Sequence, residues 1–448
     1  MKRREFLGSL AASSAAPARR KPNIVFIILD DLGYGDFGCY GQKLIRTPNA
    51  DSVARAGLRF TDCYAGGAVC APSRASLMTG LHQGHAPIRA NAGTIPLVAS
   101  DVTVAQVLKE AGYATGGFGK WGLGDARTDG IPTRHGFDRF FGYLHQIHAH
   151  SYYPDFLWDN EDRHVLRGNA NGAGRDYSAD IIAGRSFDFL KANRDRPFFL
   201  YACYTLPHAK FEIPDVAPYQ DQPWTKGQKT YAAMVTRADR YIGTILGMLK
   251  EYKLDNDTVV FITSDNGAHS GEEKGFEFFR SNGSLRGEKT QLYDGGIRVP
   301  MIVRWPGRVK PGAVSALPWA FWDVMPTMAE LAGAKAPAGI DGISVVPELA
   351  GQRQKLHDYL YWESDQFDRA RNDLNPARLS QAVRMGDWKA IRLKPGAPVE
   401  LYNLRQDPGE SKNVAAANPE VVSRIEAILK SARTAPRPHN TGTFDWAK

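Results

Sequence analysis

The stretch NIVFIILDD, residues 23–31, decides the fold class that we expect for this chain of 448 residues. It opens as a continuously apolar run rich in β-branched side chains and ends in two carboxylates, Asp30 and Asp31. A run that is apolar on both faces is typical of a strand buried in a parallel sheet. The stretch therefore predicts a buried strand with acidic side chains at its carboxyl end.

Three further apolar runs end in polar residues in the same way: TVVFITS (258–264) before Asp265 and Asn266, RPFFLYACYT (196–205) before His208, and YATGGFG (113–119) before Lys120. Helical patterns lie between the strands, at residues 47–57, 101–112 and 229–252. This alternation predicts an α/β fold, a large and mostly parallel sheet flanked by helices. Ligands bind at the carboxyl ends of such strands, where these polar residues fall.

The pattern changes near residue 355. DWKAIRL (387–393) and VELYNL (399–404), followed by a helical pattern near 418–432, predict a small antiparallel sheet and a helix. We expect a main domain over residues 21–355 and a C-terminal subdomain over 356–448. A long stretch at 143–178, rich in His, Tyr, Asn and Gly, is expected to be a loop.

Composition narrows the class of partner. With 43% hydrophobic and 23% charged residues the chain is typical of a soluble globular protein, and it lacks the 18 to 20 apolar residues of a stable membrane span. The formal charge of +8 is not gathered into a basic block, which argues against nucleic acid. A diffuse positive field suits an anionic small molecule or polysaccharide.

The N-terminal segment MKRREFLGSLAASSAAPARR, residues 1–20, pairs Arg3 and Arg4 before a weakly apolar run rich in Ala and Ser. This order is typical of a twin-arginine export signal with a small-residue cleavage region at 16–18. A disordered basic tail is the alternative. We expect an exported protein, periplasmic or secreted.

Asp30, Asp31, Asp265 and Asn266 offer three carboxylates and one amide oxygen from two strand ends. Oxygen ligands without His or Cys select a hard cation, calcium or magnesium, over zinc. Either pair alone would more often be a solvated turn. Together, each after a buried strand, they predict a metal site.

Cys70 stands in GGAVCAPSRASLMTG, residues 66–80. Pro72 fits the first turn of a helix, so Cys70 lies near the cap, where backbone N–H groups and Arg74 favour an anion. Cys70 could be a core residue, a nucleophilic thiol, half of a disulfide or a precursor of another group. A thiolate is a poor neighbour for a hard metal, whereas an oxygen group at this position would fit. The remaining cysteines, Cys39, Cys63 and Cys203, are expected to be small buried hydrophobes.

The CAPSR motif resembles the Cys-x-Pro-x-Arg signature of the sulfatases, within the alkaline phosphatase superfamily. The resemblance extends in order through PNIVFIILDDLGYGDFGCYG, TPNADSVARAGLRFTDCY, GYATGGFGKWGLG, FITSDNGAH, LRGEKTQLYDGGIRVP and GDWKAIR, which covers nearly the whole chain. It implies that Cys70 is oxidised by a maturing enzyme to Cα-formylglycine. The hydrated aldehyde of that residue would attack the sulfur of a sulfate ester.

The resemblance also implies roles for other residues. Asp30, Asp31, Asp265 and Asn266 would bind calcium, with residue 70 completing the shell. Arg74, Lys120 and Lys289 would hold the sulfate, and His208 would protonate the leaving oxygen.

One position departs from the family pattern. Many sulfatases have His where GKWGLG has Gly122, and that His is the expected base for releasing sulfate. Another imidazole, a lysine or water could take its place, or the enzyme could be weak. His85 is one candidate. The others, His145, His148 and His150 in LHQIHAHSYYP (144–154), stand beside aromatic residues that suit a sugar-binding wall.

The sequence thus predicts an exported, calcium-dependent sulfatase that acts on a sulfated carbohydrate or an aryl sulfate. A phosphonate or phosphodiester hydrolase of the same superfamily is one alternative. A non-catalytic protein that binds sulfated glycans, with Cys70 unmodified, is the other.

Overall fold

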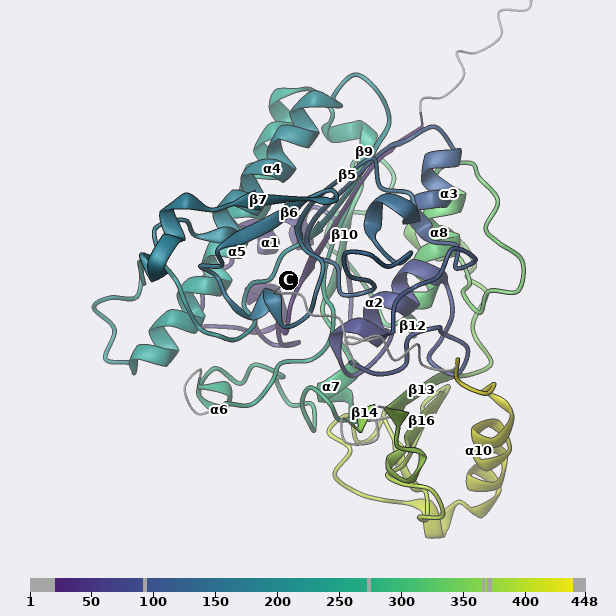
Figure 1. Ribbon diagram of the computed structural model, residues 1–448. Coiled ribbons are helices and arrows are strands. Elements are labelled where there is room, and N and C mark those ends of the chain that lie inside the picture. Colours follow the sequence, from purple (N-terminus) through teal and green to yellow (C-terminus); the bar gives the residue numbers. More distant parts are fainter. Residues whose placement is uncertain (1–20, 92–94, 272–274, 365–366, 369–372, 438–448) are drawn as a thin grey trace, which may run out of the picture.

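A ten-stranded sheet forms the centre of the protein, with helices on both faces (Figure 1). The computed structural model describes residues 21–91, 95–271, 275–364, 367–368 and 373–437, so the predicted export signal at 1–20 lies outside the described residues. The strand order is β11 (Ala313–Ser315), β2 (Leu58–Phe60), β10 (Met301–Arg304), β9 (Thr258–Ser264), β1 (Asn23–Leu29), β8 (Phe198–Cys203), β4 (Ala114–Lys120), β5 (Arg139–Tyr143), β6 (Phe156–Asp159) and β7 (Asp162–Val165).

The five central strands, from β9 to β5, are parallel to one another. Toward the two sides the sheet is mixed, because β10 runs antiparallel to β9 and β2, and β6 runs antiparallel to β5 and β7. The predicted α/β class is confirmed, and the strands predicted at 23–29 and 258–264 are β1 and β9.

Alternate side chains of β1 enter two different apolar layers. Ile24, Phe26 and Ile28 pack in one layer with α2 (Cys70–Thr79), α3 (Val104–Glu110) and α8 (Val324–Leu331). Val25, Ile27 and Leu29 pack in the other layer with α1 (Pro48–Arg55), α4 (Ser178–Ala192) and α5 (Lys226–Glu251). A strand that is buried on both faces must be apolar throughout, which explains the continuously apolar run at residues 23–29.

The C-terminal part forms a separate four-stranded antiparallel sheet, as expected (Figure 1). Its order is β13 (Leu360–Ser364), β16 (Ser380–Met385), β17 (Trp388–Arg392) and β18 (Glu400–Asn403). Ile425 and Leu429 of α10 (Pro419–Ser431) pack on one face of this sheet. The remaining short elements are α6 (Phe276–Phe279), α7 (Asp294–Ile297), α9 (Val346–Leu349), β3 (Cys63–Tyr64), β12 (Trp319–Ala320), β14 (Phe367–Asp368) and β15 (Asp373–Leu374).

The stretch predicted as a loop at 143–178 is more ordered than expected. It contains the hairpin of β6 and β7, which turns at Asn160, a residue with a positive φ of 56°. Asn tolerates this left-handed conformation, which is why a short hairpin forms inside a stretch that otherwise has turn-like composition.

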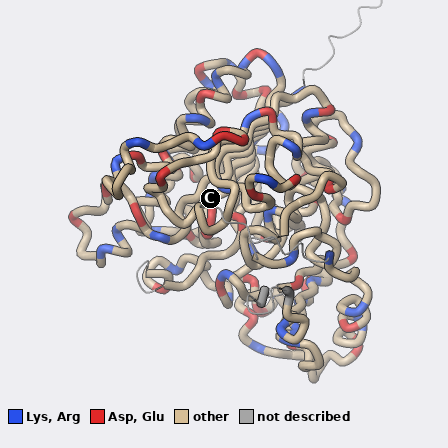
Figure 2. The backbone as a smooth tube through the Cα atoms, viewed as in Figure 1, with Lys and Arg blue, Asp and Glu red and all other residues tan. Residues whose placement is uncertain are grey.

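Lys and Arg are interspersed with Asp and Glu along the chain, as Figure 2 shows. In the part of the chain that the structure describes, no helix has the length and apolar character needed to span a bilayer.

Candidate active site

Four neighbouring parallel strands bring the predicted polar residues to one edge of the sheet. β1 pairs with β9 on one side and with β8 on the other, and β8 also pairs with β4. Asp30 and Asp31 follow β1, Asp265 follows β9, Lys120 ends β4, and the segment after β8 leads to His208. The sheet therefore brings together side chains that are far apart in sequence.

Each of the three buried carboxylates at this edge of the sheet forms an ion pair with a cation. Lys120 Nζ lies 2.8 Å from Asp30 Oδ2, and Lys289 Nζ lies 2.7 Å from Asp31 Oδ2. Arg74 Nη2 lies 2.8 Å from Asp265 Oδ2. We call these six residues, with Asn266, the site cluster. Its carboxylates lie near one another: the backbone N–H of Asp31 donates to Asp265 Oδ1 at 3.1 Å, and the charges of Asp30 and Asp31 both raise the pKa of Asp265.

The charges of the site cluster shift its pKa values in two directions. Burial alone would raise the pKa of Asp30, but the surrounding cations, Lys120 above all, hold it well below its usual range. The pKa of Asp31 is also lowered, against burial, by Lys289 and His208. Burial and the nearby Asp30 raise the pKa of Asp265 to about 6, because Arg74 offsets only part of their effect.

The donors fit a hard divalent cation. Asn266 is fully buried, and its Oδ1 has no hydrogen-bond partner among the described residues. Its Nδ2 donates to Asp31 Oδ1 at 2.7 Å, so the amide lies directly against the carboxylates. An unsatisfied buried carbonyl next to carboxylates that repel each other is a set of ligands that calcium or magnesium would satisfy.

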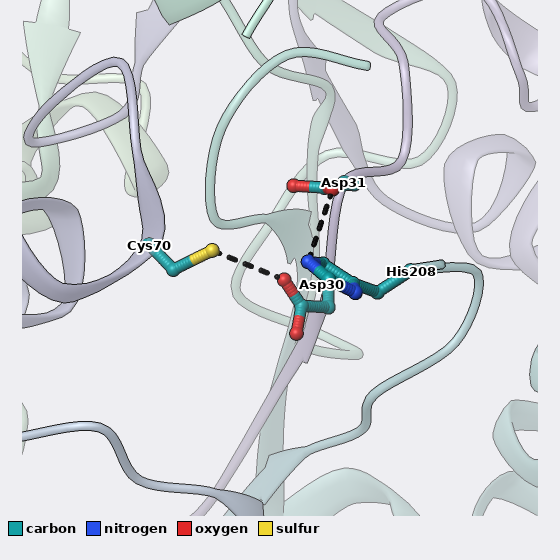
Figure 3. A group of neighbouring side chains, drawn as sticks. All are labelled: Asp30, Asp31, Cys70 and His208. Atoms are coloured by element: carbon teal, nitrogen blue, oxygen red, sulfur yellow. Dashed lines mark hydrogen bonds and ion pairs between the residues drawn. The ribbon is translucent and has the colours of Figure 1, made fainter. Parts of the chain in front are cut away.

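Cys70 is the first residue of α2 and is fully buried against the site cluster (Figure 3). Its Sγ lies 3.4 Å from Asp30 Oδ1, and Lys120 Nζ donates to it at 3.3 Å. Burial, with Asp30, raises the pKa of the Cys70 thiol far above its usual value despite Lys120 and Lys289. A thiol held in its protonated form is a poor nucleophile, so the geometry does not suit a working thiolate.

His208 lies beside Asp30 and Asp31 (Figure 3), with one ring nitrogen within 4.8 Å of Cys70 Sγ. Its Nδ1 contacts the carbonyl of Ala209, which places the ring proton on Nδ1. Nε2 then accepts from Lys289 Nζ at 3.2 Å. Burial, together with Lys120 and Lys289, lowers the pKa of His208 to about 4 despite the two aspartates, so the ring is neutral near pH 7.

The three histidines of the 144–154 loop have different surroundings. The ring of His150 lies 4.7 Å from that of His208, and its pKa is lowered by burial and by Lys120. His148 is 3% exposed and packs against Tyr143 and Phe156. Nδ1 of His145 accepts from the backbone N–H of Ile147. Of the three, the structure brings His150 to the site cluster.

His85 belongs to a different group. Its Nδ1 contacts both oxygens of Asp341, at 2.9 and 3.0 Å, and its ring stacks on His82. The three side chains resemble a metal site in their spacing. However, His82 Nδ1 accepts from the N–H of Gly84, so the Nε2 that faces Asp341 carries the proton and is not a free ligand. The hydrogen bonds of His82, His85 and Asp341 therefore account for their close spacing without a metal ion.

Sequence reasoning missed the residue that fills the space beside Gly122. A β-carbon at position 122 would lie 2.0 Å from Gln146 Nε2, and Gly122 has a positive φ of 77°. Gln146 is buried, so the space that a side chain at 122 would need is already occupied. The only sign of this arrangement in the sequence is the unexpected glycine in the motif GKWGLG.

The cysteines outside the site are unpaired. Cys63 and Cys203 are fully buried, as expected, whereas Cys39 is half-buried because it lies in a surface turn before α1.

The amino-acid sequence of this chain is similar to those of known proteins. The sulfatase family profile matches residues 22–334, and a profile described as N-sulphoglucosamine sulphohydrolase, C-terminal, matches residues 287–435. Arylsulfatase A of Homo sapiens is 33% identical, over 94% of this chain and 89% of that protein. Steryl-sulfatase of Mus musculus is 32% identical, over 95% of this chain and 83% of that protein.

A solved structure agrees over nearly the same length. The crystal structure of Ps i-CgsB in complex with k-i-k-neocarrahexaose has a TM-score of 0.81 and 28% sequence identity. The match covers 92% of this chain and 93% of that one.

Proposed function

The chain belongs to the sulfatase family and is a sulfuric ester hydrolase, and we propose that it cleaves sulfate from a carbohydrate with a formylglycine made from Cys70 and a bound calcium ion. The observation that carries this proposal is the position of Cys70. It lies at the start of α2, in contact with Asp30 and Lys120. Burial and the charge of Asp30 raise the pKa of its thiol, so the thiolate is disfavoured. An oxygen nucleophile at that position agrees with the oxygen ligands around it.

Formylglycine in its hydrated form supplies an oxygen nucleophile, and calcium supplies a Lewis acid that orients and polarises the sulfate. Asp30, Asp31, Asp265 and Asn266 would bind the ion, with magnesium as the alternative. Arg74, Lys120 and Lys289 lie around the carboxylates and would bind the sulfate oxygens, where negative charge develops. These cations are preorganised because each is already held by a carboxylate.

His208 Nε2 would lie at the leaving oxygen. In the ligand-free protein it carries a lone pair and accepts from Lys289. An anionic substrate that draws Lys289 toward its sulfate would free Nε2, and a proton taken up there would be donated to the leaving sugar oxygen.

For the imidazole missing at position 122, we propose His150. Its ring adjoins that of His208, with the two centroids 4.7 Å apart. Gln146 fills the place of a side chain at position 122, so the imidazole has to come from another part of the chain. We further propose that the 144–154 loop, to which His145 and His148 also belong, forms one wall for the sugar. The similar structure solved in complex with k-i-k-neocarrahexaose supports a carbohydrate substrate.

A direct test of the nucleophile is peptide mass spectrometry across residue 70 in protein from its native host. We expect an aldehyde in place of the thiol and bound calcium in metal analysis. Sulfate release from a panel of sulfated sugars and aryl sulfates should exceed hydrolysis of an aryl phosphodiester. A persistent thiol in active protein would refute the mechanism, and faster diester hydrolysis would refute the substrate class.

The role of His150 is tested by His150→Gln. We expect turnover to fall by roughly 100-fold with substrate binding preserved, the usual size of a general acid–base contribution. Affinity for a sulfated sugar is measured separately, in Cys70→Ala protein. His164→Gln removes an imidazole from β7 at the far side of the sheet and should have no effect. Equal turnover of His150→Gln and the parent would exclude His150.

Processing and organisation complete the proposal. We propose that residues 1–20 direct export to the periplasm or beyond, that a formylglycine-generating enzyme modifies Cys70, and that residues 21–355 and 356–448 form the catalytic domain and the C-terminal subdomain. N-terminal sequencing of the exported protein tests the signal, since cleavage should fall near residues 16–18.

A further inference from the structure

Lys289 belongs to a segment, residues 284–297, whose backbone is anchored on both sides of it. The Lys289 N–H donates to the carbonyl of Ala268 at 3.0 Å, and the Thr290 N–H donates to the carbonyl of Ala68 at 2.8 Å. These contacts hold the segment against the ends of β9 and α2. They place the ammonium of Lys289 on Asp31 and His208.

The segment also folds back on itself. The Gly295 N–H donates to the carbonyl of Arg286 at 2.7 Å, and a β-carbon at Gly295 would lie 2.2 Å from the carbonyl oxygen of Gly287. The start of α7 is therefore in direct backbone contact with the residues that precede Lys289. A shift of Asp294 would be passed to Lys289 through this contact.

Asp294 is held by the C-terminal subdomain. Lys389 on β17 is fully buried, and its Nζ lies 2.6 Å from Asp294 Oδ1 and 2.9 Å from Glu410 Oε1. Glu410 Oε2 accepts the backbone N–H of Asp294 at 2.6 Å. We call Asp294, Lys389 and Glu410 the interface cluster. Figure 1 shows α7 at the upper left of this subdomain, beside β13 and β16.

The other end of the segment is held by the same subdomain. Arg286 donates to the carbonyl of Glu410 at 2.7 Å and to the hydroxyl of Tyr402 at 3.0 Å. Its guanidinium also lies 3.9 Å from the ring centroid of Tyr293. Both flanks of Lys289 thus rest on Glu410 and its neighbours.

We propose that Lys389 is a positioning residue for sulfate binding: from the C-terminal subdomain it fixes Asp294, and through Asp294 it fixes the segment that carries Lys289. The inference rests on the proposed role of Lys289. Without the ammonium at position 389, Asp294 Oδ1 and Glu410 Oε1 would both lose the buried cation that holds them together. Movement of α7 would separate them and would carry Lys289 away from the sulfate.

The test compares two variants that each break a buried ion pair in the same small sheet. Lys389→Met acts on the interface cluster. Glu363→Gln acts on Glu363 of β13, which is fully buried and has its ion pairs with Arg89 at 3.3 Å and Arg433 at 2.9 Å, both outside residues 284–297. Binding of inorganic sulfate to the calcium-loaded enzyme is measured by calorimetry, together with kcat and KM.

We expect Lys389→Met to weaken sulfate binding by roughly 10-fold and to raise KM, while Glu363→Gln keeps the affinity of the parent. A double-mutant cycle gives the sharper result. In a Lys289→Ala background, Lys389→Met should have no further effect on sulfate binding. An equal loss in both backgrounds, or an equal loss in Glu363→Gln, would overturn the proposal.

Two outcomes separate this inference from the proposed function. If Lys289→Ala binds sulfate as well as the parent does, the proposed role of Lys289 fails. If Lys289→Ala loses affinity but Lys389→Met does not, only the positioning role fails. Should Lys389→Met not fold, Glu410→Gln weakens the same cluster more gently and should reduce sulfate affinity by a few-fold; unchanged affinity there would also overturn the proposal.

Discussion

The site cluster and the interface cluster are built from the same kinds of side chain and are both buried, but they differ in how completely they are satisfied. In the interface cluster, one ammonium lies between two carboxylates, and Arg298 adds a second cation at 3.2 Å from Asp294. In the site cluster, three carboxylates crowd together and Asn266 Oδ1 lacks a hydrogen-bond partner among the described residues. Glu410 Oε1 of the interface cluster also lacks a hydrogen bond there, but it lies 2.9 Å from the ammonium of Lys389. A closed set of buried charges stabilises a structure, whereas an incomplete set is prepared for a ligand.

The largest contrast is expected from one substitution in the site cluster. Asp265→Asn should reduce turnover by roughly 1,000-fold, because it removes a ligand from a Lewis-acid site worth several kcal/mol in the transition state. Stability of the metal-free protein should stay level or rise. The folded state raises the pKa of Asp265 to about 6, so its ionised form opposes folding at pH 7. Sulfate release and urea unfolding measure the two effects; a large loss of stability would contradict this description.

The matching substitution in the interface cluster should have the opposite effect on stability. Burial alone would raise the pKa of Asp294, but Lys389 and Arg298 lower it to about 2, so the ionised form favours folding at neutral pH. Asp294→Asn should lower the free energy of unfolding by roughly 3 kcal/mol. Denaturant titration at pH 7 measures this. If Asp294→Asn were as stable as the parent, the cluster would not be a closed structural pair.

Removal of the metal should affect only the site cluster. A ligand present at 100 times its dissociation constant stabilises the folded state by about 2.7 kcal/mol. Chelation of calcium should therefore lower the melting temperature of the parent and of Asp294→Asn alike, and calcium should restore it. Asp265→Asn should show a much smaller shift. The same shift in all three proteins would mean that the ion binds elsewhere.

The smallest effect is a pH dependence in the interface cluster. Burial, with the nearby Asp294, raises the pKa of Glu410 to about 7 against the effect of Lys389. Because the folded state retains this proton longer than the unfolded state, the stability contribution is complete below about pH 4.5 and is lost as pH rises toward 7. The loss between pH 5 and pH 7 should be about 2 kcal/mol. Glu410→Gln should flatten that part of the stability profile; an unchanged slope would assign it to another group.

The two clusters also differ in how well the sequence predicts them. The site cluster lies at the ends of strands that the sequence predicts clearly. Asp30 and Asp265 come directly after apolar runs, and parallel strands place their carboxyl ends together. The fold class and most of the candidate site could be predicted for this reason.

The interface cluster carries no such signal. Lys389 lies in a short strand of mixed composition. Glu410 lies in a turn whose polar sequence predicts an exposed loop. Their burial arises only when the C-terminal sheet packs on α7, a contact between distant segments. The same holds for Gln146, which becomes informative only once the space beside Gly122 is known.

The balance of formal charge in the site cluster has a consequence for the end of the catalytic cycle. Its three carboxylates are matched by Arg74, Lys120 and Lys289, so the cluster is neutral before ligands enter. A divalent cation adds two positive charges. A sulfate ester, with one negative charge, leaves one of them uncompensated, whereas free sulfate, with two, cancels both. The buried site should therefore retain its product more tightly than its substrate, and accumulated sulfate should act as a competitive inhibitor that slows the enzyme when sulfate is abundant.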